Sequence, residues 1–446
     1  MNSKEKGLSS WQLTMMALGT VIGGSFFLGS SVAIAVAGPS ILISYILGGA
    51  LVYLILFALS EMTVASPKVG SFCAFATREF GQGAGFVVGW VYWTGMILAM
   101  SSEATAISIL VRAWVPDLSI SLLSSIIIAV VTLLNLFGAD RLSKIESVLA
   151  AIKIFTIIFF IILALLLIFG FLHGEPVGLG ELKREAFMAS GIKGIAGSML
   201  IVMFSYAGFE IIGLAASEAH DPVRTIPKAI LATVIMLVGL YIVYIAVLLP
   251  LIPTSELNEN ISPIVAALKR WGMNWAGTVI NIVLISAIFS TMLASVFGLG
   301  RMVRSLSYQK CTPKILYDKT DVPYRGILFS GFGMLAGLGL GLLFPRVYLF
   351  LISSGGFALL FTYVVIIATH MHFRKKNGCP PEGKCQMPGY PYTSVIALLS
   401  LIAVIGSMPF ISGQAAGLLS GISIILIYST IYLIRKKMNI KNNDKI

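Results

Sequence analysis

Two stretches, ALGTVIGGSFFLGSS at residues 17–31 and MLIVMFSYAGFEIIGLAAS at residues 199–217, each place small residues in the middle of an apolar segment. The first contains Gly23-Gly24-Ser25, and the second contains Ser205 to Gly208. Interrupted segments at matching positions of two halves indicate an inverted repeat with the substrate site at the breaks. Glycine is also common in membrane helices for close packing, so the argument rests on the two matching positions.

The composition identifies a membrane protein. Of 446 residues, 57% are apolar and 11% are charged, whereas soluble domains carry about 25% charged residues. Twelve apolar runs are long enough to cross about 30 Å of hydrocarbon. They cover 11–37, 40–64, 85–113, 121–138, 146–172, 193–217, 228–252, 276–300, 326–344, 346–372, 393–410 and 412–434. The first run lacks the pattern of a signal peptide, so we interpret it as a spanning helix.

The breaks fall in the first and sixth of these runs, which defines the expected architecture. Residues 1–446 form one all-α membrane domain with twelve transmembrane helices. Helices 1–5 (11–172) form one repeat, helices 6–10 (193–372) form the inverted second repeat, and two helices (393–434) follow.

The net charge is +12, and the basic residues are unequally divided between the two predicted sides of the membrane. With the N-terminus inside, the inner segments hold 23 Lys and Arg residues and the outer segments hold seven. This asymmetry predicts that both termini are cytoplasmic. It gives the inner surface some affinity for anionic lipid and argues against a nucleic-acid partner.

Lys153 is the remaining basic residue, and it lies within the apolar helix at 148–170. A charge near the centre of a spanning helix costs roughly 3 kcal/mol, so such a residue usually faces a cavity or a partner. A desolvated lysine can release its proton and so couple proton flow to transport. The alternative is a lysine that snorkels to the cytoplasmic interface.

A broken helix offers main-chain groups for binding. The N–H groups at the start of a half-helix attract a carboxylate, and the carbonyls at the end of a half-helix attract an ammonium or a cation. Helices 1 and 6 run in opposite directions in the expected topology, so their breaks together suit a zwitterion. Phe204, Tyr206 and Phe209 flank the second break and either cover the ligand or pack in the core.

Two acids lie within spans, Glu103 in helix 3 and Glu210 after the second break. A buried carboxylate needs a partner or a proton. Each either meets a substrate amine, a cationic side chain or Lys153, or hydrogen-bonds a broken helix end. Glu61 and Glu218 lie at cytoplasmic helix ends, where interfacial ion pairing is expected.

Neither a metal site nor an enzyme is expected. His370, His372, Cys379 and Cys385 are zinc-ligand types, but their spacing matches no standard pattern. All four cysteines fall on the predicted cytoplasmic side, where disulfides are not expected. The spans contain no nucleophile–base motif, and no cofactor is predicted.

Several stretches carry a resemblance to a known family. They are AGPSILISYILGGALVYLILFALSEM (37–62), GWVYWTGMILAMSSEATA (89–106), IESVLAAIKIFTI (145–157), FSYAGFEIIGLAASEAHDPVRTIPKAI (204–230) and the helix from Asn281 to Arg301 with its continuation RMVRSLSYQKCTPKIL. The chain resembles bacterial amino acid permeases of the amino acid–polyamine–organocation superfamily. That resemblance implies the five-plus-five fold, a bacterial cell-membrane location and a site at the two breaks.

We therefore predict a substrate site around both breaks and Glu103. It comprises Ile22, Gly23, Gly24, Ser25, Phe26, Glu103, Phe204, Ser205, Tyr206, Ala207, Gly208, Phe209 and Glu210. The resemblance implies that Glu103 approaches the variable end of the substrate. It also implies that Lys153 takes the place where sodium binds in sodium-coupled cousins.

The chain departs from the family at the first break. The family pattern is G-T-G or G-A-G followed by an apolar residue, whereas here Ser25 replaces the last glycine. The main-chain donor remains, but a hydroxymethyl group occupies the glycine's space and is expected to alter substrate size or carboxylate pose.

The expected function is secondary active uptake of an amino acid by proton symport through alternating access, with sodium coupling less favoured. The alternatives are an amino acid exchanger, in which Lys153 is a permanent structural cation, and a receptor that binds without transport. The segment IRKKMNIKNNDKI at the C-terminus is too short for a signalling domain, which argues against the receptor.

Overall fold

The structure is a computed structural model that describes residues 8–66, 72–172, 174–210, 212, 219–320, 322–379 and 387–443. In these ranges the regular structure is helical throughout, and the β-type pairing is an isolated bridge between Leu8 and Ala219. The predicted all-α class is therefore confirmed.

The first half of the chain contains α1 (Ser10–Val21), α2 (Gly24–Phe27), α3 (Gly29–Ala37), α4 (Ile41–Ala65), α5 (Phe72–Phe80), α6 (Gln82–Val111), α7 (Ile120–Asn135), α8 (Ala139–Ile168) and α9 (Gly191–Ser205). The second half contains α11 (Pro222–Leu248), α12 (Pro263–Arg270), α13 (Asn274–Tyr308), α14 (Tyr324–Gly341), α15 (Val347–Asn377), α16 (Tyr392–Ser407) and α17 (Ala415–Asn443).

Eight helical segments of the described residues are long and apolar enough to cross a membrane. Two shorter apolar helices, α7 and α9, accompany them. The protein is thus a multi-pass membrane protein, while the count of twelve spans and the inverted repeat stay predictions.

Two short helices between the spans were not predicted. Helix α5 has nine residues and α12 has eight, too few for a periodic apolar pattern to stand out from a loop. Helix α5 buries Phe72, Cys73, Phe75 and Ala76 on one face. Helix α17 also continues to Asn443, beyond the predicted end at 434.

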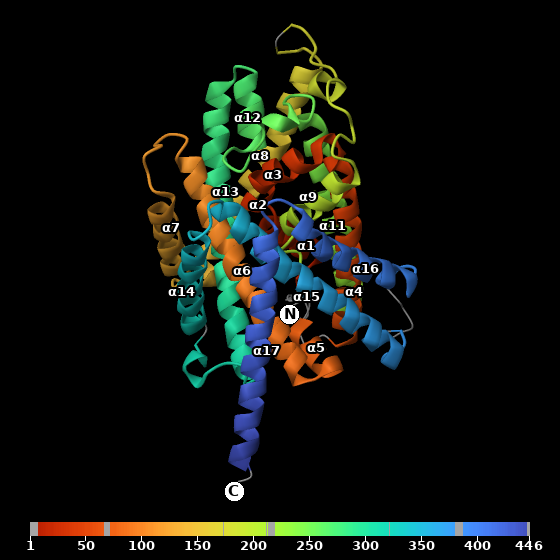
Figure 1. Cartoon of the computed structure of the whole chain (residues 1–446), viewed down its shortest axis with the longest axis vertical. Coiled ribbons are helices and arrows are strands. Elements are labelled where there is room, and N and C mark those ends of the chain that lie inside the picture. Colours follow the sequence, from red (N-terminus) through yellow and green to blue (C-terminus); the bar gives the residue numbers. More distant parts are fainter. Residues whose placement is uncertain are drawn as a thin grey trace, which may run out of the picture.

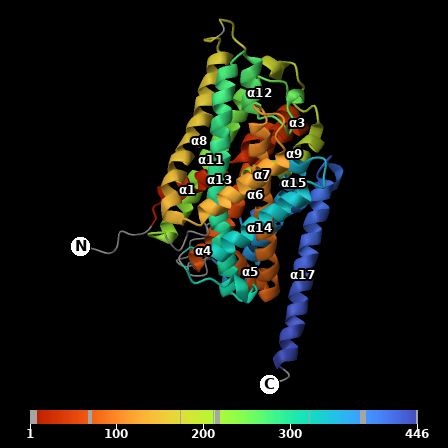
Figure 2. The ribbon, with the colours of Figure 1, turned by 90° about the vertical axis from the view of Figure 1, so that its left-hand side faces the viewer.

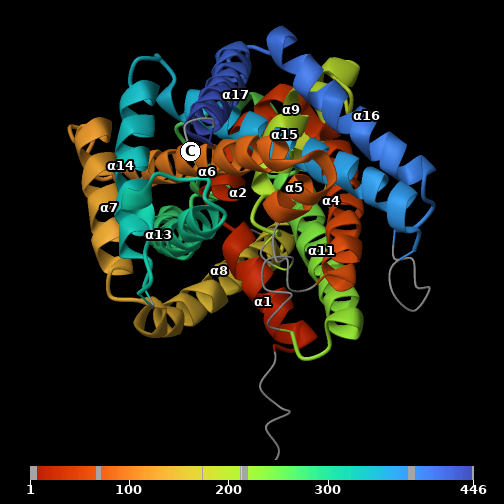
Figure 3. The same cartoon turned by 90° about the horizontal axis from the view of Figure 1, so that it is seen from below.

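The helices form an elongated bundle in which two groups pack side by side (Figures 1 and 2). One group contains α1, α3, α4, α9 and α11, and the other contains α6, α7, α13 and α14. Helix α8 contacts both groups, and α15 packs against α6, α9 and α4. Seen from below, α7 and α14 lie at one edge and α16 lies at the opposite edge (Figure 3).

Glycine permits a close helix contact between α6 and α15. A Cβ at Gly95 would lie 2.7 Å from Cβ of Ala358, and a Cβ at Gly355 would lie 3.1 Å from the carbonyl oxygen of Gly95. Small residues let helix backbones approach in this way in membranes.

The expectation of reduced cysteines is wrong at one position. Cys73 and Cys311 are free thiols, but Cys379 is disulfide-bonded. The rule that cytoplasmic thiols stay reduced describes a redox compartment and does not depend on where a particular cysteine lies in the fold.

Glu61 joins α4 to α15 through a buried ion pair. Its carboxylate lies 2.8 Å from Nε2 of His370 and contacts the Arg374 guanidinium. Glu61 and His370 are fully buried, and Arg374 also lies 4.5 Å from the ring centroid of Tyr390. Glu61 does form an ion pair, as predicted, although its partners belong to a helix. Glu218 lies outside the described residues.

We expect the substitution Glu61→Gln to destabilise the protein by about 3 kcal/mol, because it leaves the Arg374 charge buried and unpaired. Thermal unfolding of the purified protein in detergent measures the effect. Glu259→Gln is the matched control, since Glu259 faces exposed Arg346 at 3.7 Å and burial raises the pKa of Glu259 against the opposing effect of Arg346. This pair is partly exposed and contributes about 1 kcal/mol or less. Equal melting temperatures for the two variants would contradict the prediction.

Candidate functional site

Helix 1 is interrupted at Ile22 and Gly23. Helix α1 ends at Val21, and α2 begins at Gly24. Between them the backbone is extended, with ψ of 100° at Ile22 and a φ,ψ pair of −142° and −162° at Gly23. Such a break leaves carbonyls of α1 and N–H groups of α2 without intrahelical partners, and lipid cannot supply them.

Glu103 of α6 satisfies the N–H groups at the start of α2. The N–H of Gly24 donates to Oε2 at 2.6 Å, and the N–H of Ser25 donates to Oε1 at 3.1 Å. A Cβ at residue 24 would lie 2.6 Å from Oε2, so glycine is what permits this approach. The structure therefore has the helix-end hydrogen bond, one of the two alternatives for this acid.

Lys153 of α8 satisfies the opposite end of the break. Its ammonium donates to the carbonyl of Gly19 at 2.9 Å and to Oγ1 of Thr291 at 2.6 Å. The Thr291 hydroxyl in turn donates to the carbonyl of Ile22 at 3.0 Å. Lys153 is fully buried, so its charge stays among polar partners inside the bundle and does not snorkel to the interface.

The second break follows Ser205, where α9 ends and residues 206–210 form turns. The hydroxyl of Tyr241 donates to the carbonyl of Ser205 at 3.2 Å. The N–H of Gly208 donates to Oε2 of Glu210 at 2.8 Å, and the Tyr363 hydroxyl donates to Oε1. Glu210 thus hydrogen-bonds the turn that follows the end of α9.

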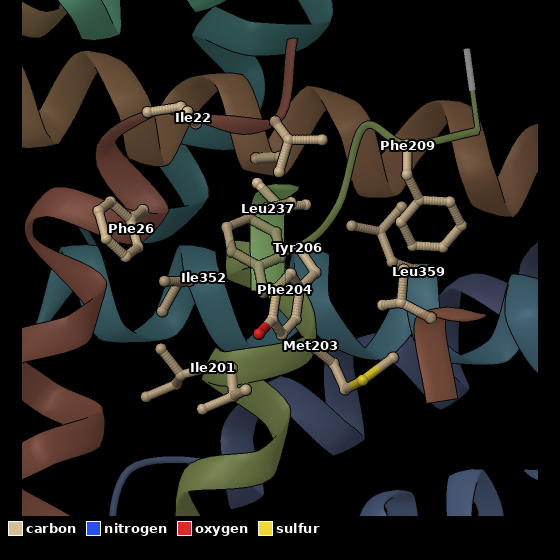
Figure 4. Packing of buried hydrophobic residues seen from close by; sticks show 14 of the residues in the cluster. Ile22, Phe26, Ile201, Met203, Phe204, Tyr206, Phe209, Leu237, Ile352 and Leu359 are labelled. Atoms are coloured by element: carbon tan, nitrogen blue, oxygen red, sulfur yellow. The ribbon is translucent and has the colours of Figure 1, made fainter. Parts of the chain in front are cut away.

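Stacked aromatic rings support the two breaks from one side. Phe26 stacks on Tyr241 with ring centroids 3.8 Å apart, and Tyr206 stacks on Tyr241 at 5.2 Å. The Tyr206 hydroxyl donates to the carbonyl of Tyr45 at 3.0 Å. Figure 4 shows Tyr206 between Phe26 and Phe209. Tyr206 thus belongs to the core that fixes the breaks relative to each other.

Phe204 and Phe209 occupy different places (Figure 4). Phe204 lines a small cavity between the breaks. Phe209 is fully buried and stacks on Tyr363 at 5.2 Å, outside the wall of that cavity. Of the two rings, Phe204 is therefore the one placed to cover a ligand.

The cavity between the breaks has a volume of about 30 Å³, roughly the space of one water molecule. The cavity is therefore too small to hold an amino acid in this conformation. Five predicted residues line the cavity: Ser25, Glu103, Phe204, Ala207 and Gly208. The other predicted residues stand behind this wall: Ile22, Gly23, Gly24, Lys153, Phe26, Ser205, Tyr206, Phe209 and Glu210.

Sequence reasoning missed the remaining wall residues: Thr20, Val21, Met96, Ala99, Met100, Thr291, Ser295 and Leu359. Thr291 matters most, because its hydroxyl connects Lys153 to the broken helix. Its signal is the small polar run FSTMLAS at 289–295 within an apolar helix. That run has the composition of ordinary helix packing and points to no partner by itself.

Among the residues that the structure describes, no group of three or more His, Cys, Asp or Glu side chains is arranged to hold a metal ion. His370 is engaged with Glu61. Cys385, one of the four possible zinc ligands in the sequence, lies outside the described residues.

Comparisons with known proteins agree over almost the whole chain. The family described as "Amino acid permease" matches residues 12–445. The gamma-aminobutyric acid permease of Bacillus subtilis (strain 168) is 31% identical over 94% of this chain and 92% of its own length. Amino-acid permease RocC of the same organism is 30% identical over 100% and 98%. A probable GABA permease of Pseudomonas aeruginosa is 32% identical over 90% and 86%.

We expect Gly208→Ala to destabilise the protein by about 1–3 kcal/mol, because Gly208 has a φ of 107°, where side chains with a Cβ are strained. The new Cβ would also lie 3.3 Å from the carbonyl oxygen of Thr20. Gly239→Ala is the matched control: it lies within α11 with nothing within 4 Å of the added Cβ. Equal melting temperatures for Gly208→Ala and Gly239→Ala would refute the proposed requirement for glycine at position 208.

Proposed function

Because this chain belongs to the amino acid permease family, we propose that it is a secondary active transporter that imports an amino acid together with protons. The family makes it an amino acid transporter of the bacterial plasma membrane and not an enzyme. Proton coupling, alternating access between two inverted repeats and cytoplasmic termini belong to the proposal. Amino acid exchange is the second candidate, since a buried cation that never titrates would serve it equally well.

One observation carries the substrate assignment: a carboxylate already lies on the first break. The Glu103 carboxylate accepts hydrogen bonds from Gly24 and Ser25 at the edge of the cavity. These N–H groups are therefore positioned for a carboxylate in a water-poor site, where charge-assisted bonds are strong. An amino acid carboxylate would bind there in place of Glu103.

The exchange of one carboxylate for another has an electrostatic consequence. Two ionised carboxylates in one buried site repel each other, so one of them takes a proton or a cationic partner. A displaced Glu103 would be protonated or would pair with an amine of the substrate. The first case couples uptake to protons, and the second favours substrates with an additional amine.

The second break would hold the substrate ammonium. The carbonyls at the end of α9, from Phe204 to Ala207, lie at the negative end of that half-helix. Ala207 and Gly208 line the cavity, so main-chain groups are within reach of a small ligand once the site opens. Phe204 would close over its side chain. Ser25 narrows the carboxylate end and would favour a small substrate.

The protonation state of Lys153 would decide how strongly helix 1 is held in place. Its ammonium holds the Gly19 carbonyl of α1 and the Thr291 hydroxyl of α13, which belong to different helix groups. Loss of its charge weakens the attraction to the negative end of α1 and would let α1 move relative to α13. Sodium is the less favoured ion because the ammonium occupies the space that a cation would take.

We expect Lys153→Ala to bind substrate measurably but to lose accumulation driven by a pH gradient, because the group that senses protons is gone. Uptake of labelled amino acids into proteoliposomes under imposed proton or sodium gradients measures this. Lys193→Ala, at an exposed residue of α9, is the control and should accumulate normally. Full pH-driven accumulation by Lys153→Ala would discard the proton role, and counterflow without dependence on the gradient would favour exchange.

We expect Glu103→Gln to lower the stability of the empty transporter by about 1.5–3 kcal/mol, since a charged acceptor of two N–H bonds is lost. A neutral amide competes less with the substrate carboxylate, so substrate should bind at least as tightly as in the wild type. Scintillation proximity binding and thermal unfolding measure the two effects. If Glu103→Gln lost substrate binding but kept its stability, the Glu103 carboxylate would not occupy the place of the substrate carboxylate.

A further inference from the structure

A second and larger pocket lies apart from the site. It has a volume of about 570 Å³ and is bordered by α6, α14, α17 and the segment 311–316. It shares no lining residue with the cavity between the breaks. Its size falls within the range of about 300–1,000 Å³ that is typical of small-molecule sites. We name it the aromatic pocket.

The wall of the aromatic pocket is built from stacked rings. Trp90 stacks on Tyr428 with centroids 5.8 Å apart, and Trp93 stacks on Phe329 at 4.9 Å. The polar atoms of these rings are already bonded within the protein. Trp90 Nε1 donates to the carbonyl of Cys311, Trp93 Nε1 donates to Ser330, and the Tyr428 hydroxyl pairs with Thr94. The interior therefore suits an apolar chain and not a zwitterion.

Two cationic side chains also line the aromatic pocket. Lys314 is exposed, and Arg435 of α17 is partly exposed. Nη2 of Arg435 donates a hydrogen bond to the carbonyl of Lys310 at 2.9 Å. The guanidinium carbon of Arg435 lies 5.7 Å from the ring centroid of Phe86. A guanidinium has five N–H donors in a planar fork, so this contact orients it and leaves donors for an anion.

The pocket opens on the outer surface of the bundle. Its lining residues Ile315 and Ile431 are 74% and 40% exposed. It lies where α17 runs along the outside of the bundle toward its basic end (Figures 1 and 2). Lys436 and Lys437 follow Arg435 in that helix. An apolar pocket that also carries two cations matches a phospholipid, which has apolar chains and an anionic head group.

We propose that the aromatic pocket binds one anionic phospholipid. Lys314 and Arg435 hold the phosphate, and an acyl chain lies against Trp90, Trp93 and Phe329. Basic pockets between helices at the membrane surface recognise anionic head groups in this manner. The bound lipid ties α17 and the segment 311–316 to α6, the helix that carries Glu103, so anionic lipid stabilises the transporter.

Delipidated protein in detergent, titrated with phosphatidylglycerol, tests this proposal. Binding is followed by native mass spectrometry and by the rise in melting temperature, with phosphatidylcholine and inorganic phosphate as separate arms. We expect phosphatidylglycerol alone to bind tightly and to raise the melting temperature. Lys314→Gln with Arg435→Gln should weaken its binding roughly 25-fold, from about fivefold for each basic residue.

Two matched controls separate the pocket from general surface charge. Lys375→Gln with Lys376→Gln removes two exposed charges from the end of α15 and should leave affinity unchanged. Ile431→Trp fills the pocket and should abolish binding, whereas Ile434→Trp, on the same exposed helix but outside the lining, should not. Equal stabilisation by phosphatidylcholine, or by inorganic phosphate alone, would overturn the proposal. So would unchanged affinity in the Lys314/Arg435 variant, or a delipidated dimer that covers this face.

Discussion

A helix broken inside a membrane must have both of its new ends satisfied by protein, and this requirement organises the centre of the molecule. Lys153 supplies a cation to the carbonyl end of α1, and Glu103 supplies an anion to the N–H end of α2. Each charge lies at the end of the helix dipole that favours it. The break and the two buried charges therefore explain each other: either one alone would be costly in lipid.

The polar groups that hold helix 1 come from other parts of the bundle. Glu103 belongs to α6 and Thr291 to α13, while α1 packs with α11 in the opposite group. The polar contacts at the break are thus contacts between groups of helices. In the proposed mechanism, a ligand that replaced Glu103, or a proton that left Lys153, would change how firmly the groups are joined. Occupancy of the site would in this way be linked to a rearrangement of the transporter.

The environment of the break is otherwise rigid. The stack of Phe26, Tyr241 and Tyr206 fixes the start of α2 against the end of α9. Tyr363 fixes Glu210 and Phe209 beside the second break. The buried pair of Glu61 and Arg374 connects α4 to α15 farther along the bundle. Because most of the other polar groups are held in place, the contacts of Glu103 and Lys153 are the ones that the proposed mechanism would change.

The sequence by itself determined the class of the protein and the position of its unusual features. Composition and the lengths of the apolar runs indicated a membrane bundle, because lipid admits little else. The glycines at 23, 24 and 208 in the middle of two apolar runs marked the breaks, because glycine is a poor helix former. Single charges in apolar helices pointed to Lys153, Glu103 and Glu210. These signals are local in the chain.

Only the tertiary structure decided which groups meet. It brought Glu103, rather than an outside ligand, onto Gly24 and Ser25, and it placed Thr291, 138 residues from Lys153, beside that lysine. It put Phe204 on the cavity and Phe209 behind it. The sequence also did not predict the short helices α5 and α12 or the disulfide at Cys379. Partner choice between helices depends on packing and rotation about each axis, and periodicity in a uniformly apolar segment does not record either one.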